Sequence, residues 1–287
     1  MYLCRIAVAI DIRCRTVATL NAASFVSLQD DGDIAPGHIA GFDIVAPIFA
    51  PVSVARERWS GHTSLPRHRH EQGYLCVVLS GSYEEAGDGG RRIVRAGDVL
   101  CHGPFDAHCD QFMAVGAETL NLRLPHFTEF ADDFCRVRDP DLIVRTAERN
   151  HDEARELLLS MLEPVHSVAQ DWPDILAADI RQQPELCLGT WAKGHGLAAA
   201  TLSRGFRRVY GISCIAYRAQ LRARRAWRSL VNGVLPLSLV AQDSGFADQA
   251  HMTRAIAALT GCTPLHWRRL ASNGFNTQGR HGRTLAP

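Results

Sequence analysis

The chain has 287 residues, of which 46% are hydrophobic and 21% charged, so it is long enough for two domains and has an ordinary globular composition. Its net charge of +1 hides an asymmetry, because residues 181–287 hold 15 Lys and Arg against 3 Asp and Glu, whereas residues 1–180 hold 16 against 27. A basic end joined to an acidic body is typical of a nucleic-acid-binding module attached to another domain.

Residues 1–35 form an N-terminal extension to which the sequence assigns no structure. Residues 1–20 are moderately apolar but carry Arg5, Asp11 and Arg13, so they match neither a signal peptide nor a membrane span. The nine cysteines of the chain include no Cys-x-x-Cys pair, which favours a reducing compartment over a disulfide framework. We therefore expect a cytoplasmic protein that does not contact a membrane.

Residues 36–128 read as short strands separated by Gly and Pro turns. Residues 74–79 form a compact β-prone run, residues 91–94 lead into a turn at 96–98, and residues 119–124 alternate apolar and polar side chains. Closely spaced strands of this kind predict a small antiparallel barrel or sandwich.

Three histidines in this region form a candidate binding site. His68 and His70 would share one face of a strand because side chains alternate, and His108 would come from a neighbouring strand. Together with Gly97 and Pro104, this pattern resembles the two motifs of the cupin barrel. The Glu expected three or four residues after the second histidine is absent. The three histidines are therefore either ligands of a divalent Zn, Fe or Ni ion or lip residues of a barrel that binds an organic effector or nothing.

Residues 129–183 are predicted to be a helical linker. Residues 141–168 are helix-prone and interrupted by Pro164, and Asp171 followed by Trp172 and Pro173 predicts a capped helix start. The acidic segment would either pair two protomers as a dimerisation helix or cover the barrel as a core helix. The domain boundary is expected near 182–184.

Residues 186–270 contain an internal repeat with an offset of 50 positions. In the repeat, Leu202, Arg204, Phe206, Gly211, Ser213, Tyr217 and Arg218 match Met252, Arg254, Ile256, Gly261, Thr263, Trp267 and Arg268. In each half an alanine precedes a glycine by four residues, Ala192 before Gly196 and Ala241 before Gly245. The small residue lets two helices cross closely and the glycine permits the left-handed turn between them, so the repeat predicts two helix-turn-helix units.

The matching stretches closely resemble the AraC family of bacterial regulators, most specifically where residues 245–254 read GFADQAHMTR. The resemblance implies a seven-helix DNA-binding module over residues 184–272, followed by a flexible tail at 273–287. It places recognition helices at about 199–210 and 249–260 in successive major grooves, with a helix over 213–231 holding them at a fixed separation.

The resemblance also assigns contacts residue by residue. The base-facing candidates are Ala200, Ser203, Arg204, Gln249, Ala250, His251 and Arg254. The phosphate candidates are Arg207, Arg208, Arg222, Arg224, Arg225 and Arg268. Arg can bind guanine, Gln adenine and Ala a thymine methyl group, while further arginines strengthen the salt-dependent contact with the backbone. Residues 257–259 replace a stretch that is usually basic, so we expect fewer phosphate contacts from the second unit.

The sequence as a whole predicts an α+β protein, with an N-terminal cupin-like antiparallel β-barrel before an all-α C-terminal domain of two tandem helix-turn-helix units. The expected function is sequence-specific transcription regulation without catalysis and without a required cofactor. The expected partners are double-stranded DNA, RNA polymerase, a second copy of the chain and a small-molecule effector of the barrel. The alternative is a cupin-type metalloenzyme with an appended helical domain, which would have no need of the 50-residue repeat.

Overall fold

The computed structural model describes residues 52, 55–125, 128, 130, 133–165 and 171–278, with side chains to residue 272. The predicted extension at 1–35 lies outside the described residues. The last helix continues to Gln278, so the predicted tail from residue 273 is helical over its first six positions.

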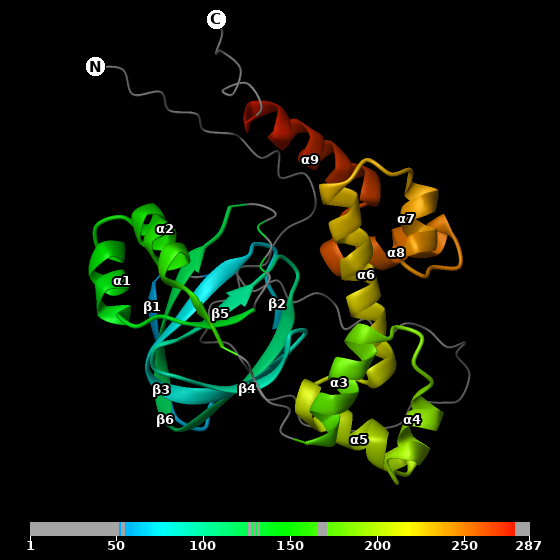
Figure 1. Ribbon diagram of the computed structural model, residues 1–287, viewed down its shortest axis with the longest axis horizontal. Helices are drawn as coiled ribbons and strands as arrows, with labels where there is room; N and C mark the ends of the chain where they lie inside the picture. Colours follow the sequence, from blue (N-terminus) through cyan, green and yellow to red (C-terminus); the bar gives the residue numbers. More distant parts are fainter. Residues whose placement is uncertain are drawn as a thin grey trace, which may run out of the picture. The chain divides into compact units, whose positions relative to one another are not determined.

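Eight antiparallel strands form one sheet. They are β1 (Arg56–Trp59), β2 (Ser64–Arg69), β3 (Tyr74–Gly87), β4 (Gly90–Arg95), β5 (Asp98–His102), β6 (Ala107–Arg123), β7 (Phe134–Arg136) and β8 (Glu163–Pro164). Their order is β1-β6-β3-β5-β7-β8, with β2 also beside β6 and β4 beside β3 (Figure 1).

The two long strands, β3 and β6, bend where the sheet curls. The bends lie at Gly81 and Gly116, whose φ angles of 74° and 67° favour glycine. A Cβ atom on Gly81 would lie 2.0 Å from the carbonyl oxygen of Gly116, so any side chain at Gly81 would clash with the neighbouring backbone. The sequence predicted a strand over residues 74–79 only; instead the strand bends at Gly81 and continues to Gly87.

The apolar run that opens β3 is buried on both faces. Leu75 and Val77 point towards helices α1 (Pro140–Ala147) and α2 (His151–Met161). Tyr74, Cys76 and Val78 point to the opposite face, into the core that the curled sheet encloses. Both sets are close to fully buried. A strand covered on both sides explains why the sequence shows a continuous apolar stretch instead of an alternating one.

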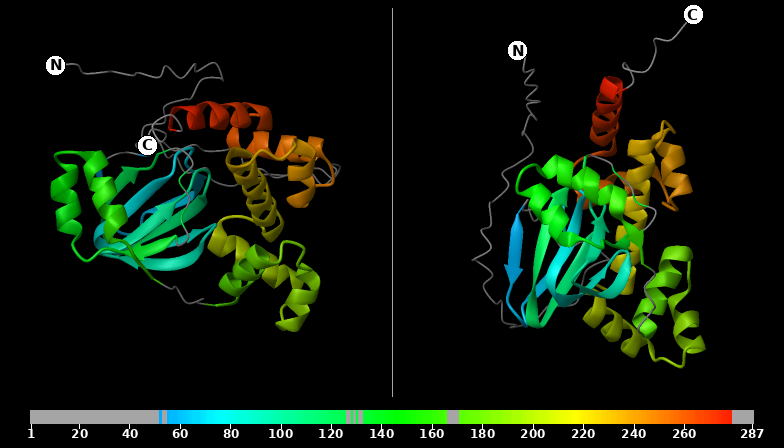
Figure 2. Two further views of the ribbon diagram at one scale, coloured as in Figure 1. Left: turned by 45° about the horizontal axis from the view of Figure 1, so that its top comes forward. Right: turned by 60° about the vertical axis from the view of Figure 1, so that its left-hand side comes forward.

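Helices α1 and α2 lie together against one side of the sheet (Figure 2). The segment was predicted to break at Pro164, but it breaks earlier, where the side chain of Asn150 accepts hydrogen bonds from two backbone N–H groups and starts α2. Pro164 lies beyond α2, in β8. The two helices therefore cover the sheet, which is the second of the two roles predicted for them.

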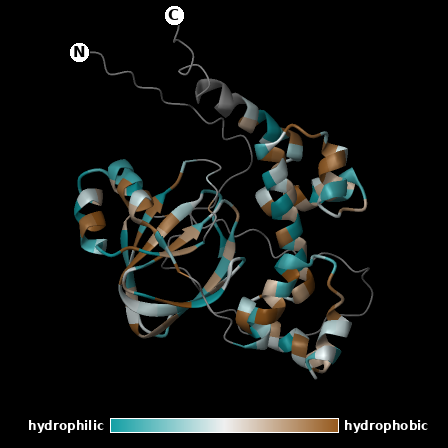
Figure 3. Cartoon of the chain, viewed as in Figure 1, coloured by the Kyte–Doolittle hydropathy of each residue, from teal (hydrophilic) through white to brown (hydrophobic). Residues whose placement is uncertain are grey.

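The C-terminal part consists of helices. They are α3 (Trp172–Gln182), α4 (Leu188–Gly194), α5 (Ala199–Tyr210), α6 (Cys214–Asn232), α7 (Leu237–Asp243), α8 (Gln249–Thr260) and α9 (Pro264–Gln278). These helices carry both apolar and polar residues, as amphipathic helices do (Figure 3). Among the described residues, none of these helices combines the length and apolar composition that crossing a bilayer requires.

The helices pack around two cores. One contains Phe206 and Tyr210 of α5, together with Leu176 of α3, and the other contains Met252 and Ile256 of α8 around α6. Helix α3 therefore packs into the first core although it precedes the expected boundary at 182–184, and its capping box at Asp171 is as predicted. The predicted fold class, an antiparallel β domain followed by a helical domain with two helix-turn-helix units, is confirmed.

Two glycines provide a matched test of the bend in the sheet. We expect Gly261→Ala to cost about 1–2 kcal/mol, because its φ of 76° is left-handed but no atom lies within 4 Å of the added Cβ. Gly81→Ala combines the same backbone strain with a backbone clash that cannot relax cheaply, so we expect roughly twice that loss or more. Urea unfolding of both variants measures the difference; equal losses would show that the approach of Gly81 to Gly116 is not needed.

Candidate functional site

Each helix-turn-helix unit is built as its sequence predicts. In the first, Ala192 of α4 is buried and Gly196 adopts a φ of 64° before α5 begins. In the second, Ala241 of α7 is buried and Gly245 adopts a φ of 74° before α8. The two recognition helices span 199–210 and 249–260, the ranges that the family resemblance implies.

The inward faces of the recognition helices match position by position. Leu202 and Phe206 of α5 are buried, and so are Met252 and Ile256 of α8. Both helices end at a glycine in the left-handed conformation, as a helix C-terminus favours. Helix α6, which begins with Ser213 as its N-cap, joins the two units.

Six of the seven base-facing candidates present their side chains to solvent. These are Ala200, Ser203, Arg204, Gln249, Ala250 and Arg254. The seventh, His251, is half-buried, and its ring meets the ring of Phe246 edge-on at 5.1 Å. The protein therefore offers an arginine from each recognition helix for contact, whereas His251 already packs against its own unit.

The phosphate candidates fall into two groups. Arg207, Arg208 and Arg225 are exposed. Arg222 lies over the ring of Phe246 at 5.1 Å and donates to the carbonyl oxygen of Gly245 at 3.2 Å, so it braces the second unit against α6. Arg268 is half-buried.

Arg224 is placed differently from the prediction. Its side chain is 11% exposed and forms ion pairs with two carboxylates of the β domain, Asp88 at 2.8 Å and Asp106. In this conformation the guanidinium group of Arg224 is engaged by two carboxylates and is not available to a DNA phosphate.

Residues 191–270 match a family model described as a helix-turn-helix domain. The virulence regulon transcriptional activator VirF of Yersinia enterocolitica and the thermoregulatory protein LcrF of Yersinia pestis are each 32% identical to this chain over 89 residues, which is 30% of the chain and 33% of either relative. Residues 191–270 are an AraC-type helix-turn-helix domain. The chain matches about a third of the length of these curated relatives.

A structural similarity extends over more of the chain but is weak. ToxT from Vibrio cholerae aligns with 75% of this chain and 97% of its own, at 7% identity and a TM-score of 0.36. A similarity of this size supports no residue-by-residue correspondence.

Asp88, at the turn between β3 and β4, is the centre of the contact between the β domain and the AraC-type domain. Its buried carboxylate pairs with Arg67 and Arg224 and accepts from the backbone N–H of Ala107 at 3.3 Å. Burial alone would raise the pKa of Asp88, but the two arginines hold it below its ordinary value. Tyr217 of α6 also donates its hydroxyl to the carbonyl oxygen of Asp88 at 3.2 Å. We call Arg67, Asp88, Asp106 and Arg224 the clasp.

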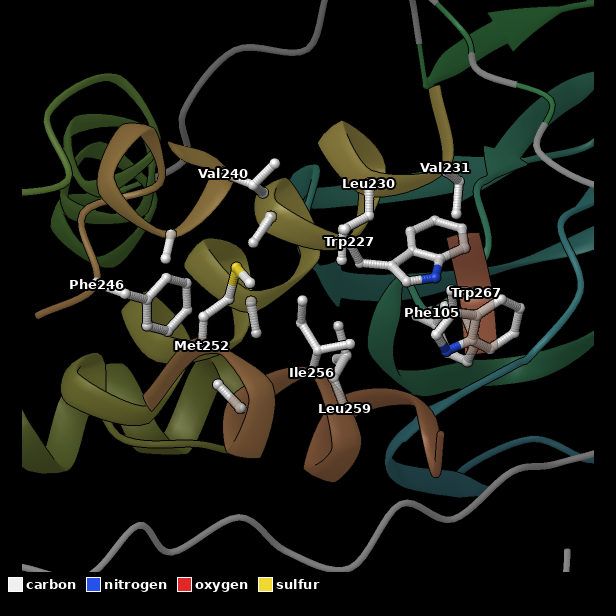
Figure 4. Close-up of a cluster of buried hydrophobic side chains, with 14 of the residues drawn as sticks. Phe105, Trp227, Leu230, Val231, Val240, Phe246, Met252, Ile256, Leu259 and Trp267 are labelled. Carbon is white, nitrogen blue, oxygen red and sulfur yellow. The ribbon is translucent and has the colours of Figure 1, made fainter. Parts of the chain in front are cut away.

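The β domain also contacts the second unit. Phe105, with a φ of 62° and 1% exposure, enters the second helical core, where it meets the rings of Trp227 and Trp267 edge-on at 5.0 Å and 5.4 Å (Figure 4). Arg69 donates to the carbonyl oxygen of Leu259 at 3.3 Å. Arg67 donates to the carbonyl oxygen of Tyr210 in the first unit at 3.4 Å, so the contact of the β domain includes α6 and both units.

The predicted histidine site is also assembled. His68 and His108 are paired across β2 and β6, with ring centroids 4.3 Å apart, and nitrogen atoms of His68, His70 and His108 lie within 4.8 Å of one another. Burial lowers the pKa of His68 and of His108, for His108 well below its ordinary value with neighbouring His68 adding to the effect. Neutral imidazoles of this kind are the form that binds metals.

Sequence reasoning missed a second group that shares His108. Glu85 of β3, His102 of β5 and His108 also place one ligand atom each within 4.8 Å of the others, and all three are buried. Glu85 lies 3.4 Å from His102. Burial lowers the pKa of His102, but this carboxylate outweighs it and raises the pKa above its ordinary value. Glu85 lies in the part of β3 beyond residues 74–79, which the sequence did not predict to be a strand.

A cavity of about 20 Å³ adjoins this second group. Its lining includes Glu85, His102 and His108, together with the clasp carboxylates Asp88 and Asp106. A volume of this size holds about one water molecule or ion, whereas organic ligands need several hundred cubic ångströms.

The two recognition helices differ in their N-caps. The Asp248 side chain accepts from the backbone N–H of His251, whereas Ala198 at the matched position has no side-chain cap. We expect Asp248→Ala to lower the free energy of unfolding by about 1 kcal/mol and Ala198→Ser to raise it by about 0.5–1 kcal/mol. Urea denaturation followed by circular dichroism tests both changes. If neither moved the midpoint, local capping would not limit the stability of these helices.

Proposed function

We propose that this protein is a sequence-specific DNA-binding transcription regulator that reads DNA with both α5 and α8. The observation that carries the proposal is the pair of matched units, each with an exposed arginine, Arg204 or Arg254, at the same position of its recognition helix. Arginine binds the O6 and N7 atoms of guanine in the major groove through two hydrogen bonds. An enzyme would have no need of two such units in register.

The charge distribution supports the same proposal. The basic half of the chain carries the AraC-type domain, and Arg207 and Arg208 extend the exposed positive surface of α5. The corresponding positions of α8 are Ala257 and Ala258. Non-specific attraction to phosphates is therefore concentrated in the first unit, and specificity is shared.

We further propose that the β domain controls DNA binding through the clasp. A buried carboxylate and a buried guanidinium each cost several kcal/mol unless they are paired, so Arg224 leaves Asp88 and Asp106 only when something else compensates these charges. An effector that weakens the clasp would return Arg224 to solvent and add one cation to α6. Pairing of two protomers and contact with RNA polymerase remain predictions of the family resemblance.

The recognition assignment is tested by selecting bound sites from random duplex DNA with the unaltered chain and with Arg204→Ala and Arg254→Ala. We expect each substitution to cost ~1–3 kcal/mol and to relax the base preference in its own half of the site. Arg145→Ala, at an exposed position of α1, is the matched control and should leave both quantities unchanged. Retained affinity and preference in both test variants would refute the assignment.

The clasp is tested with Asp106→Asn, which keeps the shape of the side chain but removes its charge. We expect tighter DNA binding and a slope of log K against log salt that steepens by up to about 0.9, because Arg224 loses one of its two carboxylate partners and exchanges Asp88 for a phosphate more readily. Asp133→Asn is the control, since Asp133 pairs with Arg92 inside the β domain. Fluorescence anisotropy at several salt concentrations gives both quantities; an unchanged slope would mean that Asp106 does not restrain Arg224.

A further inference from the structure

The cavity beside the clasp is lined by the donor set Glu85, His102 and His108, and His68 and His70 do not take part in its lining. A carboxylate with two imidazoles is a set that binds Zn²⁺, with water completing the coordination. The Nδ1 atom of His108 is buried and has no hydrogen-bond partner among the described residues. The motif that resembles cupins includes His68 and His70, whereas the cavity is lined by Glu85, His102 and His108.

We propose that Glu85, His102 and His108 bind one divalent transition-metal ion in this cavity. The ligand atoms lie within 4.8 Å of one another, and a tetrahedral Zn²⁺ site needs separations of about 3.4 Å, so small rotations of the three side chains complete the site. The three residues come from β3, β5 and β6, and β3 pairs with both of the other strands, with Tyr74 opposite His102 and Gly87 opposite His108. Imidazole and carboxylate together favour Zn²⁺, Fe²⁺ or Ni²⁺ over Ca²⁺ and Mg²⁺.

The position of the ion gives it a regulatory role, which rests on the proposed function. Asp88 and Asp106 line the same cavity and hold Arg224. An ion of charge +2 attracts these carboxylates and repels the guanidinium group, so it weakens the clasp without entering the AraC-type domain. Metal binding should therefore strengthen DNA binding.

The site is tested on the full chain, freed of metal by a chelator and then titrated with Zn²⁺ by calorimetry and with Co²⁺ by visible absorption. Glu85→Gln and His102→Gln should each lower the affinity by more than about a hundredfold, beyond the effect of outer-shell changes. His70→Gln is the matched control, because it removes a ligand of the neighbouring set only, and it should bind within about threefold of the unaltered chain. Circular dichroism confirms folding, and if one test variant fails to fold the other decides.

The outcomes separate the two sets. Loss of binding in His70→Gln with binding retained in Glu85→Gln would place the ion at His68, His70 and His108 and overturn the proposal. Uptake of neither metal by the unaltered chain would overturn it as well. These titrations require no DNA, so they decide the site even if the proposed function fails.

The regulatory role has its own readout, which is the affinity for the selected DNA site with and without Zn²⁺. We expect Zn²⁺ to tighten binding about tenfold in the unaltered chain and to have no effect in Glu85→Gln or in Arg224→Ala. If the chain bound Zn²⁺ without a change in its DNA affinity, the metal site would stand but its regulatory role would be refuted. A chain that binds no DNA at all would instead contradict the proposed function.

Discussion

The ion pairs of Asp88 determine how the two parts of this protein are joined. Its carboxylate is almost fully buried, so it is stable only with both Arg67 and Arg224 beside it. Arg67 belongs to the β domain and Arg224 to α6, which carries a helix-turn-helix unit at each end. A change in the electrostatic surroundings of Asp88 is therefore transmitted to the helix on which both units depend.

The contact with the β domain makes the two units unequal. Phe105 and Arg69 bind the second unit, one by packing against Trp267 and the other through the carbonyl oxygen of Leu259. The first unit also contacts the β domain, where Arg67 approaches the carbonyl oxygen of Tyr210 at 3.4 Å, but it keeps exposed arginines on the last turn of its recognition helix. In the second unit, the stretch without basic residues is 257–259, and it ends at Leu259, whose carbonyl oxygen accepts from Arg69 of the β domain.

The parts of this fold that the sequence predicts are those fixed by local physics. The limits of α5 and α8 follow from left-handed glycines and capping positions within a dozen residues, and the meeting of His68 with His108 follows from strand alternation and one pairing. The clasp could not be predicted, because Asp88 and Arg224 are 136 positions apart and nothing near Arg224 distinguishes it from its exposed neighbour Arg225. Glu85 was missed because a glycine that bends a strand looks in the sequence like one that ends it.

A small cavity can control a DNA-binding domain only through charge. At about 20 Å³ it admits a single ion or water molecule, so it cannot act by the displacement of a bulky ligand. Charge is sufficient, since two unit charges 4 Å apart near a protein surface interact by about 4 kcal/mol, and an equilibrium moves from 1:99 to 99:1 for about 5.5 kcal/mol. The tenfold change expected in DNA affinity corresponds to only about 1.4 kcal/mol. The carboxylates that restrain Arg224 are then the same groups through which the β domain can release it.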